Sequence, residues 1–183
     1  MKLVIILIGF ATLSCKMNNP NTEHLISGSD SITMSNQNSD LSENDDLSED
    51  AKEWLEMVIP SVFNDGGFAM KDICTEEYYQ YKTDATGVGY DGGMKETAFH
   101  GKWRNSFDTK YAGMGVGFLI SGQDYGKIEL PTINYIKRDT KDNYIFDLVI
   151  RDVDGKVNYP ITIKIVPRGK AYLIADVLQP IIE

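Results

Sequence analysis

The stretch YIFDLVIRDVDGKVNYPITIKIV, residues 144–166, holds two runs of β-branched and aromatic residues on either side of a turn signal. Apolar and polar side chains alternate from Ile161 to Ile165, which predicts a strand with one buried face. The pair Asp154-Gly155 is typical of a tight hairpin turn. These residues therefore predict two antiparallel strands joined by a hairpin.

Two further strand-like runs flank this hairpin. GKIELPTINYIKR (126–138) precedes it, and KAYLIADVLQPI (170–181) follows a second turn signal, PRGK (167–170). Short connections between consecutive strands favour antiparallel neighbours. The C-terminal half is therefore predicted to be a meander of four antiparallel strands.

Helical patterns come before the strands. In SEDAKEWLEMVIPSVF (48–63), apolar residues recur at helical spacing after Ser48, a suitable N-cap. Pro60 lacks a backbone N–H, so it is expected to end or kink this helix. The sequence NDGG (64–67) then predicts a turn.

A second helical stretch, FAMKDICTEEYYQYK (68–82), contains Thr75 followed by two glutamates, a further cap signal that divides it into two short helices. The glycine-rich residues 83–103 are predicted to form a loop. Another short helix is expected in WRNSFDTKYAGM (103–114).

Helices followed by an antiparallel meander indicate an α+β fold, with N-terminal helices packed on a curved sheet of four or more strands. The opening helix, the ICTEEYYQY segment and the four closing strands resemble the nuclear-transport-factor-like, or cystatin-like, cone. They resemble more specifically an uncharacterised family of bacterial lipoproteins with this fold. The resemblance covers residues 48–183 and implies helices packed into the concave face of the sheet. A lipocalin-like fold or another small α+β sandwich is the alternative.

The N-terminus MKLVIILIGFATLSC (1–15) has a charged start at Lys2 and then an apolar run of about 11 residues. A membrane-spanning helix needs about 20 such residues, so the run fits a signal peptide. The stretch resembles a lipoprotein signal of the Bacteroidota type, although Thr12 stands where leucine is usual. The resemblance implies that residues 1–14 are removed and that Cys15 is the site of lipid attachment. An ordinary secretory signal that leaves Cys15 as a thiol is the alternative.

Residues 15–47 are rich in Ser, Asn and Asp and contain no aromatic residue, which predicts a flexible acidic tether to a domain at residues 48–183. With Cys15 lipidated, Cys74 is expected to be an unpaired, buried thiol. The protein is therefore expected in the cell envelope, anchored by its lipid to a membrane, with the outer membrane favoured over the inner one.

The 183-residue chain has a net charge of −9 and no block of basic residues. Nucleic acids reward clustered Lys and Arg, so no nucleic-acid partner is expected. No group of His, Cys and acidic residues has the spacing of metal ligands, so neither a metal nor another cofactor is expected.

Two aspartates interrupt apolar strands: Asp147 in IFDLV and Asp176 in LIADVL. In a concave sheet either carboxylate could point into a pocket, with a hydroxyl partner from Tyr78 or Tyr79 and with Tyr172 on the face of Asp176. The alternation of strand residues also allows both aspartates to lie on the solvent face. That placement is preferred for both, in the case of Asp147 because Arg151 shares its face.

His100 is the only histidine after the predicted tether. It could act with Asp84 or Asp91 of the same glycine-rich region. The preferred interpretation is a surface histidine beside Lys102 and Arg104.

Two classes of function follow. The first is a non-catalytic domain that binds a small ligand or a protein at the envelope, including an immunity protein that blocks a toxin. The second is a small hydrolase or isomerase that uses Asp176, Tyr78 and His100 in a cavity. A pocket shared by Asp176 and a tyrosine hydroxyl would favour the enzyme, and a cone filled by apolar side chains would favour the binding domain.

Overall fold

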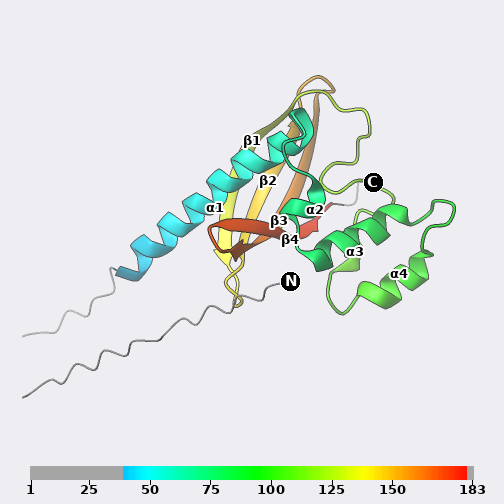
Figure 1. Ribbon diagram of the computed structural model, residues 1–183, viewed down its shortest axis with the longest axis horizontal. Helices are drawn as coiled ribbons and strands as arrows, with labels where there is room; N and C mark the ends of the chain where they lie inside the picture. Colours follow the sequence, from blue (N-terminus) through cyan, green and yellow to red (C-terminus); the bar gives the residue numbers. More distant parts are fainter. Residues whose placement is uncertain (1–38, 181–183) are drawn as a thin grey trace, which may run out of the picture. The chain divides into compact units, whose positions relative to one another are not determined.

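The four predicted strands form one antiparallel sheet in the computed structural model (Figure 1). They are β1 (Ile128–Arg138), β2 (Tyr144–Asp152), β3 (Val157–Arg168) and β4 (Ala171–Leu178), in the order β1-β2-β3-β4. The predicted meander is confirmed, as is the α+β class with helices packed on a four-stranded sheet. The sheet is strongly twisted. Figure 1 shows this twist, since β4 runs at a steep angle to β1 and β2.

The structure describes residues 39–180, with side chains from residue 47 onward. The predicted signal at residues 1–14 and the lipid site Cys15 lie outside this range, as do the first 24 residues of the predicted tether, 15–38. The apolar residues of the described part form one hydrophobic core.

Alternate residues of the two central strands supply the floor of this core. From β2 these are Tyr144, Phe146, Leu148 and Ile150, and from β3 they are Ile161, Ile163 and Ile165, all of them buried. Their register pairs Phe146 with Ile163, so the buried faces of the two strands coincide. The hairpin quoted from the sequence therefore packs as its alternation predicted.

Helix α1 (Ser39–Asn64) covers the core face. It buries Ala51, Leu55, Val58 and Ile59 at helical spacing. The side chain of Asn64 then binds the backbone of Ile128 twice, through its amide nitrogen and its oxygen, at 2.9 Å each. The end of α1 is thus fixed to the first residue of β1.

The boundaries of this helix differ from the expected ones at both ends. Ser48 lies inside α1 and not at its N-cap, since the helix begins nine residues earlier, at Ser39. Serine costs only about 0.5 kcal/mol relative to alanine within a helix, so a capping residue type does not by itself begin one. Pro60 does not end the helix, which continues to Asn64. The complete burial of Val58 and Ile59 offsets the hydrogen bond that proline removes.

The predicted pair of short helices is present as α2 (Met70–Ile73) and α3 (Glu76–Gly87). Thr75 caps α3, since its hydroxyl accepts a hydrogen bond from the backbone N–H of Tyr78 at 3.2 Å. The N-terminal boundary of α3 is therefore where the sequence placed it.

The predicted loop at 83–103 is wrong at both ends. Helix α3 continues to Gly87, and α4 occupies Glu96–Trp103. Phe99 and Trp103 pack on Tyr81 with ring centroids 5.4 and 5.7 Å apart, so tertiary contacts outweigh the unfavourable glycines. The helix expected at 103–114 is a single 3-10 turn, η1 (Thr109–Tyr111).

Cys74 is free and buried, as predicted. Its backbone forms a parallel bridge with Ile174 at the edge of β4, and the next N–H, that of Thr75, donates to the Ile174 carbonyl at 2.8 Å. Burial raises the pKa of the Cys74 thiol to about 12, so the unreactive neutral form dominates at neutral pH.

Among residues 39–180, none of the helices combines the length and the apolar character that crossing a membrane requires.

Candidate functional site

A cavity of about 640 Å³ lies between the segment 109–121 and the start of β3. We call it the apolar cleft. Its lining residues are Thr109, Lys110, Gly113, Met114, Val116, Leu119, Ser121, Val157, Asn158, Tyr159, Pro160, Ile161, Gln179 and Pro180. The volume and the apolar lining with a few polar groups are typical of sites for small molecules.

A buried lysine lies directly behind the wall of the apolar cleft. Lys82 of α3 is 1% exposed, and its ammonium donates to the carbonyls of Ala112 at 2.6 Å and Gly113 at 3.0 Å. The third hydrogen bond goes to Gln179 Oε1 at 2.5 Å. All three partners are uncharged, and burial lowers the pKa of Lys82 to about 7.

Gln179 connects this lysine to the wall of the cleft. Its Nε2 donates to the carbonyl of Gly117 at 3.3 Å, and its backbone N–H donates to the carbonyl of Tyr111 at 3.1 Å. Gly113 has a φ of +56°, and a Cβ at this position would collide with Gln179 Oε1. Hydrogen bonds from Lys82 and Gln179 therefore hold the segment 109–121, which forms one wall of the cleft, at several points.

Two bonds from α3 complete this attachment. The hydroxyl of Thr86 donates to the carbonyl of Val116 at 2.9 Å, and the N–H of Gly115 donates to the carbonyl of Ala85 at the same distance. The Ala85 carbonyl lies in the last turn of α3 and also accepts the C-cap N–H of Val88 at 3.2 Å. One wall of the cleft is thus an extension of the end of α3.

The charge of the apolar cleft differs from that of the chain as a whole. Lys110 is the single charged residue that lines it, and no Asp or Glu does, although the chain carries a net charge of −9. With Lys82 behind the wall, both charges at the cleft are positive. Its electrostatic potential therefore favours an anion or a neutral apolar group over a cation.

The comparisons with known proteins give a uniform result. No family model, curated protein or solved structure matches this chain. The geometry of its own residues therefore carries the argument about function.

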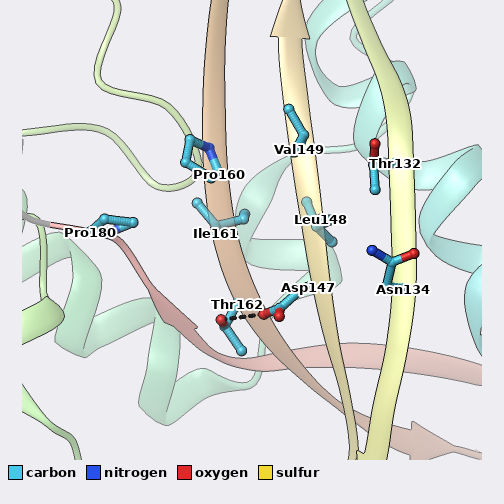
Figure 2. A pocket seen from close by; sticks show the side chains of 9 residues that line it. All are labelled: Thr132, Asn134, Asp147, Leu148, Val149, Pro160, Ile161, Thr162 and Pro180. Atoms are coloured by element: carbon cyan, nitrogen blue, oxygen red, sulfur yellow. Dashed lines mark hydrogen bonds between the residues drawn. The ribbon is translucent and has the colours of Figure 1, made fainter.

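Asp147 lies on the exposed face of the sheet, where its carboxylate accepts a hydrogen bond from the Thr162 hydroxyl at 2.6 Å (Figure 2). Thr132 and Asn134 of β1 flank it across a hollow of about 290 Å³. This is the solvent-face placement that the sequence favoured for Asp147.

Tyr172 lies in a third cavity, an open groove of about 890 Å³ beside α1 that we call the aromatic groove. Its lining residues are Leu47, Asp50, Glu53, Trp54, Met57, Arg138, Tyr144, Pro167, Gly169, Lys170, Ala171 and Tyr172. The Tyr172 ring lies 5.9 Å from that of Trp54 and 5.8 Å from that of Tyr144, and its hydroxyl donates to the Leu47 carbonyl at 3.4 Å.

Asp176 and Tyr78 are electrostatic neighbours, but they line none of the three cavities above. Burial raises the pKa of Asp176 to about 6, and Lys164, its partner across the strands, opposes that rise. Burial also raises the pKa of Tyr78, and the charge of Asp176 adds to this effect. The Tyr78 hydroxyl reaches only the carbonyl of Phe118, at 3.5 Å.

His100 lies on α4. Among the described residues, it forms no hydrogen bond or ion pair with Asp84 or Asp91, its predicted partners. Its Nδ1 is 2.7 Å from the Thr109 hydroxyl, and its Nε2 is 3.6 Å from a Glu96 oxygen. Asp84 instead accepts from Lys102 at 2.7 Å and from the Trp103 indole at 2.8 Å. Of the five predicted site residues, Asp176 and Tyr78 are therefore neighbours, and the five do not share one pocket.

The sequence reasoning missed Lys82 and Gln179. A signal for Lys82 was available, since it follows Tyr78 by four residues and precedes Ala85 by three, which places all three on one face of a helix. Gln179 gave no signal, because its role depends on a contact across 97 residues of chain. In the described part of the chain, no group of three or more His, Cys, Asp or Glu side chains could hold a metal ion.

Proposed function

We propose that this chain is a lipid-anchored protein of the cell envelope whose folded part binds a small ligand with an apolar body. The apolar cleft carries this proposal, through its volume of about 640 Å³ and its largely apolar lining. Burying the apolar body of a ligand there would contribute roughly 25 cal/mol for each Å² removed from water. The few polar groups at the wall would orient the ligand.

Support for the anchor comes from the sequence alone. Lys2, the apolar run that follows it and the small Ser14 before Cys15 resemble a lipoprotein signal. A polar tether after Cys15 would hold the binding domain clear of the membrane while keeping it at the surface.

The alternative enzyme class has less support. It required an enclosed pocket shared by Asp176 and a tyrosine hydroxyl, and neither Asp176 nor Tyr78 lines any of the three cavities. Buried apolar side chains, among them Val58 and Ile163, fill the space between α1 and the sheet. A binding role is therefore the better supported proposal.

A cleft-filling substitution tests the binding role. Residues 37–183 form one compact unit that contains the whole described core, so the binding experiment uses this segment. Val157→Trp places an indole in the apolar cleft, and Val153→Trp is the matched control, since Val153 is exposed on the same hairpin and lines no described cavity. The probe is N-phenyl-1-naphthylamine, a neutral dye that fluoresces in apolar sites.

We expect the wild type and Val153→Trp to bind the dye, and Val157→Trp to bind it at least about tenfold more weakly, a loss of about 1.4 kcal/mol. Circular dichroism confirms that both variants are folded. Equal affinity in all three proteins would refute the apolar cleft as the binding site.

A separate substitution tests the anchor. Cys15→Ser is expected to abolish palmitate labelling and to release the full chain from the membrane fraction. Cys74→Ala is the control and should leave both unchanged, because Cys74 is buried in the core. Membrane association that survives Cys15→Ser would contradict the lipid anchor.

A further inference from the structure

We propose that the apolar cleft takes an amphiphilic anion, a small molecule with an apolar tail and one anionic head, and that this head lies against Gln179 with Lys82 behind it. The inference rests on the proposed binding function and names the class of ligand. Three features carry it: the charges around the cleft, the fixed orientation of Gln179, and the missing counter-charge of Lys82.

The charges favour an anion over any other polar head. Asp and Glu outnumber Lys and Arg by 27 to 18 in the chain, yet no carboxylate lines the cleft and its single charged lining residue is Lys110. Lys110 also stacks over the ring of Tyr111, with Nζ 5.3 Å from the centroid, which keeps it beside the cleft. A cleft free of acids on an acidic protein is complementary to a negative ligand.

Lys82 fixes which way the Gln179 amide points. An ammonium only donates hydrogen bonds, so the atom that faces Lys82 at 2.5 Å has to be the oxygen of the amide. The Nε2 group is then on the other side of the amide, where one of its two protons goes to the Gly117 carbonyl. The second N–H of Gln179, a residue that lines the cleft, is left as a donor for a bound anion.

Among residues 47–180, whose side chains the structure describes, Lys82 has hydrogen bonds to neutral oxygens and no ion pair with a carboxylate. Helix α3 itself brings Tyr78 and Tyr81, the segment 109–121 brings Lys110, and the chain after β4 brings Gln179. Asp176 acts on both tyrosines and Asp108 acts on Tyr81, but neither carboxylate is among the causes that shift the pKa of Lys82, where burial alone is responsible. An anion bound against Gln179 would supply a negative charge for Lys82, with the Gln179 side chain between the two charges.

The first experiment compares two ligands that differ only in the head group. Octanoate and 1-octanol have the same apolar tail, and titration calorimetry with residues 37–183 at pH 7 measures both affinities. We expect octanoate to bind about tenfold more tightly, because hydrogen bonds to a charged group are about twice as strong as neutral ones. Octanol binding as tight as octanoate would overturn the anion inference and leave the proposed function intact, whereas binding of neither would overturn both.

A second measurement uses the wild type and needs no substitution. The counter-charge favours protonated Lys82, so octanoate binding at pH 8 should take up protons, and binding at pH 6 should not. Titrations in two buffers of different ionisation enthalpy measure this uptake. An equal proton balance at both pH values would contradict a head group beside Lys82.

A matched pair of variants places the head group. Gln179→Glu puts a carboxylate where the amide was, and its pairing with Lys82 keeps that lysine satisfied, so the fold should be retained. It should remove the preference for octanoate over octanol. Lys141→Gln, on the exposed hairpin between β1 and β2, alters the net charge by the same amount and should keep that preference.

A preference that survives Gln179→Glu would overturn the assignment of the head group to this residue.

Discussion

The apolar cleft and the aromatic groove place their charges in opposite ways. At the cleft, the ammonium of Lys82 is 1% exposed and bonded only to uncharged oxygens. At the groove, Asp50, Glu53 and Lys170 are all exposed and both signs are present. The cleft therefore has a buried charge that titrates near neutral pH, whereas the groove has exposed charges that water and salt screen.

Buried and exposed charges differ in how strongly they affect the free energy of unfolding. A buried charge is coupled to folding through its pKa, so its contribution depends on pH. Exposed charges shift little between the folded and unfolded states and contribute little.

The largest effect is expected from Lys82. Because burial lowers its pKa to about 7 from the ordinary value of 10.5, the unfolded chain binds more protons between these pH values. Stability should therefore rise with pH above 7, by about 2 kcal/mol between pH 7 and pH 9. Urea unfolding at the two pH values measures it.

Lys82→Met should remove this rise, and the exposed Lys141→Gln should keep it. A methionine variant with the same pH dependence as the wild type would show that another group is responsible. The comparison of slopes stays informative even if the methionine variant is less stable at every pH, since Ala112 and Gly113 then lose a hydrogen-bond donor.

A smaller effect of the opposite sign is expected from Asp176. Its pKa is raised to about 6 from 3.8, so the folded protein binds more protons in this interval and stability falls as the pH rises through it. Asp176→Asn should therefore stabilise the protein by about 1–2 kcal/mol at pH 7 and flatten the profile between pH 4 and 6.

Asp147→Asn is the control, because Asp147 is exposed and bonds only to Thr162 among the described side chains. A gain in stability from Asp147→Asn equal to that from Asp176→Asn would argue against burial as the cause.

The smallest effect is expected at the aromatic groove. Lys170→Gln removes an exposed charge and should change the free energy of unfolding by less than about 0.5 kcal/mol, at pH 7 and pH 9 alike. Chemical denaturation at both pH values measures it. A change of the size expected for Lys82 would remove the contrast between the two regions.

Much of the fold could be predicted from local patterns. The alternation in Ile161–Ile165 and the turn at Asp154-Gly155 predicted the central hairpin, and Thr75 predicted the start of α3. Each of these signals acts within a few residues, so no knowledge of distant contacts was needed.

The errors fall where distant contacts outweigh local preference. Glycines suggested a loop over 83–103, but Phe99 and Trp103 pack on Tyr81 and hold α4 in place. Pro60 suggested a helix end, but the buried residues beside it keep α1 continuous to Asn64. Helix stability in proteins comes mainly from such packing, which local propensity does not include.

The candidate site was less predictable than the fold. Strand alternation favoured the solvent face for both Asp147 and Asp176, but a bulge between Lys164 and Ile165 in the pairing of β3 with β4 alters the alternation near Asp176, where burial raises the pKa. Lys82 was not among the predicted site residues, and lysine is a residue type that is almost never fully buried.

By itself, the sequence determined the four-stranded meander, the helices before it, the cap at Thr75 and the burial of Cys74. These follow from periodicity and from residue types within short windows. The tertiary structure alone decided that Lys82 of α3, Gly113 of the cleft wall and Gln179 after β4 meet in one buried network. The physical reason is that a buried donor has to find acceptors wherever the fold provides them, and here these lie 30 to 97 residues away along the chain.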